Sequence, residues 1–219
     1  MQEHRLTVSR TARYVTLGPT DGSARDVWLV CHGYGQLAPR FIRHFASLDN
    51  GVQRLVVAPE GLSRFYVDGG KGAPGKVGAS WMTAECRLEE IEDYLNYLDT
   101  VCQPLVGTRD RGTVRFTALG FSQGVATVAR WAMRTRFSPD RLILWAGVLP
   151  PELDLQNRPS PLQDIEIITV AGDADSLMPS TALVDHESRL VQSGLKHRKL
   201  TFSGGHELNV DTLLQLAKY

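Results

Sequence analysis

The sequence has no excess charge of either sign and no long apolar run. Among its 219 residues, 24 Lys and Arg balance 24 Asp and Glu, and no block of like charges occurs. Proteins that bind nucleic acid or an anionic membrane usually present a basic face, so both partners are disfavoured. The chain also lacks the run of about 18 apolar residues that a membrane-spanning helix needs. A small or neutral partner, with no membrane insertion, is therefore favoured.

Cysteines and targeting signals are scarce as well. The three cysteines, Cys31, Cys86 and Cys102, are odd in number and show no CxxC spacing. That spacing is typical of zinc and redox sites, so we expect three reduced thiols and no metal. Residues 1–10 mix charged and apolar side chains, unlike the ordered regions of a secretory signal. These absences lead us to expect a cytoplasmic protein.

What is present is the pattern of a folded α/β protein, with 42% hydrophobic and 22% charged residues. Apolar, β-branched runs of strand length alternate with longer stretches of helical period. The expected strands are 27–31, 54–58, 114–119, 142–146, 165–171 and 198–202, and the expected helices are 41–48, 83–101, 123–134, 180–192 and 210–217. Two earlier segments, near 6–9 and 13–17, look like a leading antiparallel hairpin.

The strands are nearly continuous apolar runs, which is typical of a mostly parallel sheet with helices on both faces. Repeated strand–helix–strand units joined by right-handed crossovers predict a doubly wound α/β sheet. The length alone allows one or two domains. No internal repeat or change of composition marks a boundary, so we expect residues 1–219 to form one domain with no separate cap.

One glycine-rich stretch, residues 59–80, interrupts this alternation. It is too long for a routine connection, and we expect either a mobile surface loop or a loop that borders the active site. Within it, residues 70–77 fit the pattern GxxxxGK. Val77 stands where a phosphate-binding loop needs a Ser or Thr hydroxyl, and no strand leads into the glycines. Nucleotide binding is therefore not expected.

Residues 120–124, Gly-Phe-Ser-Gln-Gly, have the pattern G-x-S-x-G between an expected strand and an expected helix. Such a sharp strand-to-helix turn exposes the serine hydroxyl at the carboxyl edge of the sheet, and the glycines remove Cβ atoms that would collide. Ligands of open α/β sheets bind at this edge. Ser122 is therefore the candidate nucleophile.

A serine nucleophile needs a base, and in this type of fold the chain order is Ser, then Asp or Glu, then His. Three histidines follow Ser122. We expect His186 to be a solvated helix residue, and cationic neighbours around His197 disfavour an imidazolium there. His206 lies on a loop between the last strand and the last helix, and we expect it to be the base.

Two carboxylates, Asp173 and Asp175, compete as the acid that orients His206. Both follow the strand expected at 165–171. We favour Asp175, which would project from the loop toward Ser122. Asp173 fits better as a turn residue whose carboxylate binds local backbone N–H groups.

Acyl transfer also needs two N–H donors for the oxyanion of the tetrahedral intermediate. One is expected from Gln123, the residue after the nucleophile, at the start of a helix. The other is expected from the backbone of Tyr34 in the loop 31–36, where Gly33 and Gly35 allow close approach. His32 is expected to be a structural, hydrogen-bonded residue.

These motifs together resemble one known family. They are H-G-x-G at 32–35, G-F-S-Q-G at 120–124, Ser-Trp at 80–81, G-D-x-D at 172–175 and Gly-Gly-His at 204–206. The chain is similar, from about residue 27 to its end, to the phospholipase/carboxylesterase family of α/β hydrolases, which includes acyl-protein thioesterases and small bacterial esterases. The resemblance implies an α/β-hydrolase fold, a triad of Ser122, Asp175 and His206, oxyanion donors at Tyr34 and Gln123, and no cofactor.

Three positions depart from the usual family pattern. Val125 stands where a second glycine commonly follows the elbow, Gln36-Leu37 replaces an acidic or amide residue plus threonine, and Met82 replaces a phenylalanine. These changes leave the chemistry intact and bear on acyl-chain length and on the recognition of protein substrates.

The expected reaction is hydrolysis of small-molecule carboxylic esters or thioesters with small to medium acyl groups, through an acyl-enzyme. Tyr34, Trp81 and Leu149 are candidates for an apolar acyl pocket, although each could equally be ordinary core. Lactone or peptide hydrolysis, or a non-catalytic ligand-binding role, are the alternatives. The sequence leaves the natural substrate and the oligomeric state open, a homodimer included.

Overall fold

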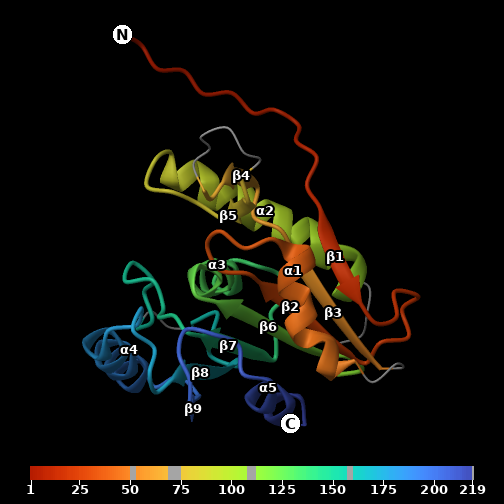
Figure 1. Cartoon of the computed structure of the whole chain (residues 1–219), viewed down its shortest axis with the longest axis vertical. Helices are drawn as coiled ribbons and strands as arrows, with labels where there is room; N and C mark the ends of the chain where they lie inside the picture. The colour runs from red at the N-terminus through yellow and green to blue at the C-terminus, as the bar shows by residue number, and fades with distance from the viewer. Residues whose placement is uncertain (50–52, 69–74, 108–111, 157–159, 219) are drawn as a thin grey trace.

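The computed structural model describes residues 1–49, 53–68, 75–107, 112–156 and 160–218. Within these residues, seven strands form one large sheet (Figure 1). In the order in which they lie side by side, they are β1 (Tyr14–Leu17), β3 (Arg54–Pro59), β2 (Asp26–Cys31), β6 (Arg115–Phe121), β7 (Arg141–Trp145), β8 (Glu166–Gly172) and β9 (His197–Phe202). All neighbouring strands run parallel except β1, which pairs antiparallel with β3.

Helices cover both faces of this sheet. One face carries α2 (Arg87–Val106), α3 (Gln123–Ala132) and α4 (Ser180–Ser193), and the other carries α1 (Ala38–Phe41), the 3-10 helix η1 (Ile42–Leu48) and α5 (Val210–Ala217). The mostly parallel α/β sheet with helices on both faces is therefore confirmed.

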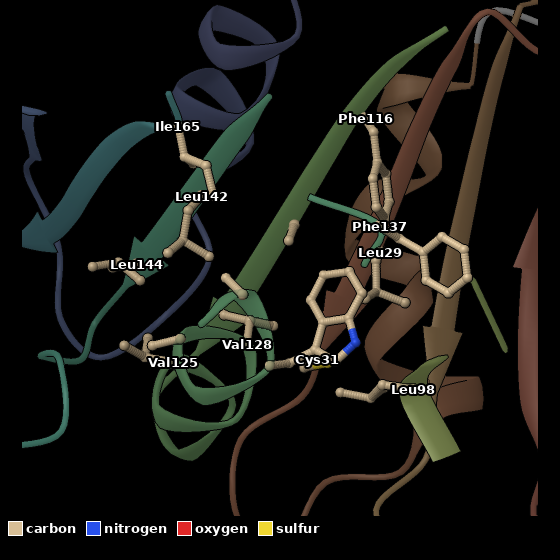
Figure 2. Packing of buried hydrophobic residues seen from close by; sticks show 14 of the residues in the cluster. Leu29, Cys31, Leu98, Phe116, Val125, Val128, Phe137, Leu142, Leu144 and Ile165 are labelled. Carbon is tan, nitrogen blue, oxygen red and sulfur yellow. The ribbon is translucent and has the colours of Figure 1, made fainter. Parts of the chain in front are cut away.

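The central strand β2 shows why the sheet needs both layers. All six of its residues are buried. Leu29 and Cys31 belong to the core beneath α2 and α3, where they share a cluster with Leu98 (Figure 2). Trp28 and Val30 point to the opposite core beneath η1 and α5. Because successive side chains of a strand alternate between faces, a continuous apolar run requires cover on both sides.

The leading hairpin is corrected by the structure. Residues 1–13 form no strand (Figure 1), and part of this segment lies against the body of the protein, where Arg5 pairs with Glu89 of α2 at 2.6 Å and Arg13 bonds to Glu60 at 2.9 Å. Residues 14–17 form β1, which pairs with β3 instead of with residues 6–9. The physical reason is that the edge of β3 offers backbone partners, and β1 in that place packs Val15 and Leu17 against the core beneath η1 and α5.

Two helix boundaries also differ from expectation. The helix expected from residue 83 begins only at Arg87, because Cys86 adopts a left-handed conformation with φ of 46°. It then continues past Pro104 to Val106. The helix expected at 41–48 is the short α1 followed by the 3-10 turns of η1.

Part of the glycine-rich stretch 59–80 folds into a small antiparallel pair, β4 (Ser63–Tyr66) and β5 (Val77–Ser80). Residues 69–74, which include most of the phosphate-loop-like sequence, lie outside the described residues. The described part borders the loop after β2, because Gln36 forms a bridge with Ala79. No helix in the described part of the chain is long and apolar enough to cross a membrane.

Candidate active site

Ser122 occupies the sharp turn between β6 and α3. Its φ of 54° and ψ of −116° are unusual for a residue with a side chain and indicate local strain. A Cβ atom at Gly120 would lie 2.2 Å from the Gly124 carbonyl oxygen, and one at Gly124 would lie 2.2 Å from the Cys31 carbonyl oxygen. Both motif glycines are therefore needed for close packing, and the turn places Ser122 at the carboxyl edge of the parallel strands.

Asp175 and His206 meet beside this turn. His206 Nδ1 lies 2.8 Å from Asp175 Oδ2, and the Asp175 side chain is only 1% exposed. The other carboxylate oxygen of Asp175 accepts a bond from the Leu177 N–H at 2.9 Å. The contact with Asp175 favours a proton on Nδ1, which leaves Nε2 of His206 as the basic nitrogen. The His206 ring packs on Phe121, directly before Ser122, with 5.0 Å between ring centroids.

The loops that carry the acid and the base are bonded to each other. The Ala174 N–H donates to the Gly204 carbonyl at 2.9 Å, and the Gly204 N–H donates to the Asp173 carboxylate at 3.0 Å. A Cβ atom at Gly172 would lie 2.4 Å from the Gly204 oxygen, so the two loops pack closely. Asp173 thus binds a backbone N–H group, but that of Gly204, which lies 31 residues further along the chain, instead of a local one.

In the loop after β2, a backbone N–H group without an acceptor would be of little note by itself, but the N–H group of Tyr34 lies between two that are bonded. The Gly33 N–H donates to the Gln36 side chain at 2.8 Å, and the Gly35 N–H donates to the Ala79 carbonyl at 2.9 Å. Within the described residues, the Tyr34 N–H between them has no acceptor. The Gln123 N–H is at the first position of α3, where helical N–H groups have no partner inside the helix.

His32 supports this loop from the interior, as expected of a structural histidine. It is fully buried, its Nδ1 lies 2.8 Å from the Gly33 carbonyl, and its Nε2 accepts from the Gly61 N–H at 2.9 Å. Burial lowers the pKa of His32, which favours the neutral form. The Gly33 carbonyl shares one planar peptide with the Tyr34 N–H, so holding this carbonyl also orients that N–H.

Glu60 holds the next part of the same loop. Its carboxylate accepts bonds from Arg13 at 2.9 and 2.8 Å, from Arg64 at 2.6 Å and from the Ala38 N–H at 3.2 Å. Burial opposes the charge, but the bonds from Arg13 and Arg64 outweigh it and lower the pKa of Glu60. Sequence analysis did not identify this cluster, because Arg13 and Ala38 are 47 and 22 residues away from Glu60 in the chain.

The three candidates for an acyl pocket divide into two groups. Trp81 and Leu149 are each 1% exposed and belong to the core, which agrees with the alternative that they are ordinary core residues. Tyr34 is 60% exposed, and its ring packs on Phe65 with 5.0 Å between centroids. Only the Tyr34 ring therefore offers surface to a ligand.

His186 is not the solvated helix residue that its position suggested. It is 2% exposed, its Nδ1 accepts from the Leu149 N–H at 3.3 Å, and its Nε2 lies 3.1 Å from the Thr169 hydroxyl. Burial, with the nearby positive charges of Arg189 and Lys199, lowers the pKa of His186 to about 4. The error arose because the packing of α4 against the loop after β7 has no local sequence signal.

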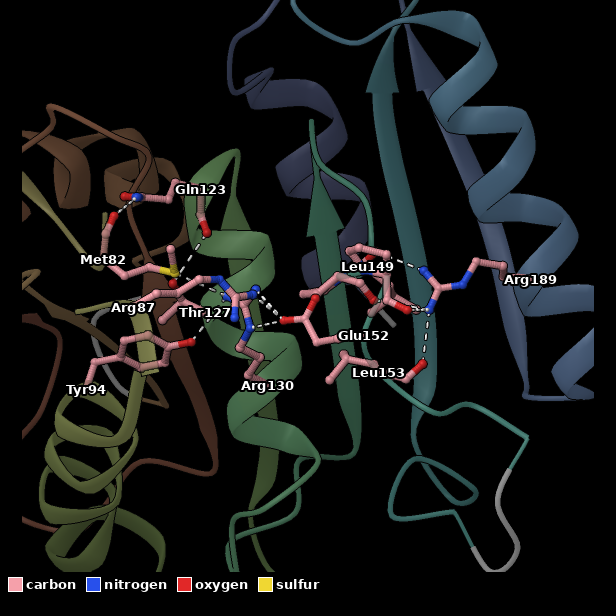
Figure 3. Close-up of polar contacts among 12 residues, drawn as sticks. Met82, Arg87, Tyr94, Gln123, Thr127, Arg130, Leu149, Glu152, Leu153 and Arg189 are labelled. Carbon is pink, nitrogen blue, oxygen red and sulfur yellow. Dashed lines mark hydrogen bonds and ion pairs between the residues drawn. The ribbon is translucent and has the colours of Figure 1, made fainter. Parts of the chain in front are cut away.

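The same loop is held by arginines from three helices (Figure 3). Arg189 of α4 donates to the carbonyls of Leu149, Pro150 and Leu153 at 3.0–3.1 Å. Glu152 accepts from Arg130 of α3 at 2.7 Å and from Arg87 of α2 at 2.6 Å. These contacts fix the chain after β7 beside the elbow helix.

In the described part of the chain, no group of three His, Cys, Asp or Glu side chains is arranged to hold a metal ion. Cys31 and Cys102 are buried free thiols, and Cys86 is an exposed one. The arrangement at Ser122, Asp175 and His206 can instead support nucleophilic attack on a carbonyl with proton transfer to His206.

Comparison with known proteins bears on the fold. No family model matches the sequence, and no curated protein matches it. Among solved structures, esterase PE8 is 21% identical with a TM-score of 0.71 and covers 95% of this chain and 97% of its own. Acyl-protein thioesterase 2 from Zea mays is 17% identical with a TM-score of 0.68 and the same coverage. A phospholipase/carboxylesterase from Dyadobacter fermentans is 16% identical with a TM-score of 0.65 and covers 97% of both chains. The chain therefore has the α/β-hydrolase fold of the esterases, acyl-protein thioesterases and phospholipase/carboxylesterases.

Proposed function

We propose that this protein is a serine hydrolase that cleaves carboxylic esters, and also thioesters, of small to medium acyl groups. The observation that carries the proposal is the 2.8 Å contact between the buried carboxylate of Asp175 and His206, beside the strained Ser122. Strain of this kind is costly and is concentrated at functional sites. The names of the structural neighbours, which are esterases and thioesterases, support the same activity.

In the proposed mechanism, Ser122 Oγ attacks the acyl carbonyl while His206 Nε2 takes its proton. Asp175 holds the imidazole in the required tautomer and stabilises the imidazolium that forms. The tetrahedral oxyanion receives bonds from the N–H groups of Tyr34 and Gln123. His206 then protonates the leaving alcohol or thiol, and an acyl-enzyme remains. Water activated by His206 releases the acid, and no cofactor is needed.

The acyl group is proposed to lie against the exposed ring of Tyr34 and its neighbour Phe65. Trp81 and Leu149, which are buried, are assigned to the supporting core. We further propose that residues 1–219 act as one unit without a separate cap, and that the protein works in the cytoplasm, which its three free cysteines support.

The variant Ser122→Ala tests this function. We expect it to lower kcat/KM for a short p-nitrophenyl ester by about 10³-fold or more. Labelling by a fluorophosphonate probe, which reacts with an activated serine, should be lost in the same variant. Near wild-type hydrolysis by Ser122→Ala would contradict the proposal. Wild-type protein assayed on matched esters, thioesters, lactones and peptides then defines the substrate class.

A further inference from the structure

We propose that the side-chain amide of Gln123 is a positioning residue for the oxyanion hole. The amide connects the start of α3, which carries the Gln123 N–H donor, to residues 79–82. The same residues bind the loop that carries the Tyr34 N–H donor. The proposal deepens the serine-hydrolase function above and rests on it. Any residue after Ser122 would provide a backbone N–H, so the nature of this side chain calls for a separate physical reason.

The amide of Gln123 is bonded on both sides (Figure 3 shows its contact with Met82). Nε2 donates to the Met82 carbonyl at 2.9 Å and to the Ser80 hydroxyl at 3.0 Å. Oε1 accepts from the Trp81 N–H at 3.2 Å. The amide therefore binds both a carbonyl and an N–H group of one short segment. A side chain with only donors or only acceptors could not replace it.

The same segment also holds the Tyr34 loop. The indole Nε1 of Trp81 donates to the His32 carbonyl at 2.8 Å. Ala79 accepts from the Gly35 N–H at 2.9 Å and donates to the Gln36 carbonyl at 3.1 Å. The residues on either side of Tyr34 are thus bonded to a segment that is itself bonded to Gln123.

The segment around residues 78–82 packs closely against the loop that carries Tyr34. A Cβ atom at Gly78 would lie 2.4 Å from the Gly35 carbonyl oxygen. Gly35 itself has a φ of 74°, a backbone conformation that glycine adopts readily and that residues with a side chain rarely adopt. Residues 79–82 therefore support both donor-bearing segments. The hydrogen bonds of the Gln123 amide connect residues 79–82 to α3.

Loss of this link should affect the transition state more than the bound substrate. An oxyanion hole works because its donors are already placed where negative charge develops. A small displacement of one donor weakens bonds that are made only in the tetrahedral state, so kcat falls while KM changes little.

The test uses the isosteric variants Gln123→Glu and Gln123→Met in the full-length protein, both of which keep the backbone N–H. The first removes the donor to Met82, and the second removes donor and acceptor. For each variant, kcat and KM are measured on a p-nitrophenyl ester. The inhibition constant of an alkyl trifluoromethyl ketone is also measured, because Ser122 adds to this ketone to form an oxyanion. The matching alcohol, which cannot form one, is the ground-state reference.

We expect kcat to fall by about tenfold to a hundredfold, below the full loss of an oxyanion donor, with KM changed less than about threefold. Affinity for the ketone should fall with kcat, and affinity for the alcohol should not. Ser80→Ala removes one hydrogen bond to the Gln123 amide without altering α3, and it should also lower kcat and ketone affinity. This variant tests the inference if the Gln123 variants fail to fold.

The control is Thr135→Val, which removes a bond of 2.6 Å to Asp99 just beyond the other end of α3. It should lower the melting temperature without changing ketone affinity. Unchanged kcat and ketone affinity in the Gln123 and Ser80 variants would overturn the inference. The inference would also be overturned if Thr135→Val lowered kcat and ketone affinity as much as the Gln123 variants do at a similar fall in melting temperature. Full activity of Ser122→Ala would instead overturn the proposed function itself.

Discussion

His206 Nδ1 and Asp175 Oδ2 lie 2.8 Å apart although 31 residues separate them in the chain. Two neighbouring parallel strands, β8 and β9, bring their loops together at one edge of the sheet. The same edge carries Ser122 at the end of β6. The relationship predicts different roles for the two aspartates of this loop.

Asp175→Asn should lower kcat by about 10²-fold to 10⁴-fold, because an amide at this position favours the wrong tautomer of His206. Asp173→Asn is the matched control, since Asp173 binds the Gly204 N–H instead of the imidazole. It should reduce thermal stability with much less effect on kcat. Steady-state kinetics of the two variants decide the assignment, and an equal loss in both would contradict it.

Tyr34→Ala separates the roles of the Tyr34 ring and its backbone. The variant keeps the N–H that is proposed to bind the oxyanion, but it removes the exposed ring that packs on Phe65. We expect KM for medium-chain esters to rise about threefold to tenfold, the equivalent of roughly 1 kcal/mol of lost contact, with kcat nearly unchanged. Acetyl esters, which do not reach the ring, provide the internal comparison. A large fall in kcat on both substrates would argue against this division.

His186 should make the protein less stable in mild acid. Its pKa is lowered to about 4 in the folded state, against about 6.5 in an unfolded chain. The unfolded state therefore binds the extra proton first, and stability falls as the pH drops from 6.5 toward 4. The shift corresponds to about 3 kcal/mol as an upper bound. Urea unfolding between pH 4 and 8 measures it.

His186→Gln is the control for this pH dependence. The amide has no proton to gain in this range, so the variant should show a smaller decline in stability between pH 6.5 and 4 than the wild type. An identical decline in both proteins would assign the acid sensitivity to other groups.

Glu60→Gln should destabilise the fold by about 1–3 kcal/mol, because the bonds that Arg13 and Arg64 make to a buried, charged acceptor become bonds to a neutral one. Glu92→Gln is the control, because its pairing with Arg134 is exposed and should contribute less than about 1 kcal/mol. Urea unfolding at neutral pH compares them. Equal effects would mean that burial of Glu60 adds nothing.

Much of the fold could be predicted from local patterns. The buried parallel strands are recognisable because a strand covered on both faces must be apolar at every position, as in β2. The turn at Ser122 is recognisable because a strand, a G-x-S-x-G pattern and a helix follow each other directly. Asp175 and His206 could be selected because chain order in this fold limits the choice to a few residues.

Other features had no such local signal. The pairing of β1 with β3, the burial of His186 and the cluster around Glu60 all depend on segments that are distant in the sequence. The N-terminal hairpin was predicted because residues 6–9 and 13–17 have strand-like composition, which says nothing about the partner of a strand.

The sequence by itself determined most of the order of strands and helices and the turn that carries Ser122, since each depends on neighbours in the chain, and it singled out Asp175 and His206 as candidates by their order after Ser122. Only the tertiary structure decided which backbone N–H groups are used and which remain unpaired, as at Gly33, Tyr34 and Gly35. It also revealed the three hydrogen bonds between the Gln123 amide and residues 80–82. The physical reason is that a hydrogen bond depends on the distance and direction of two groups, which chain folding sets and local composition does not encode.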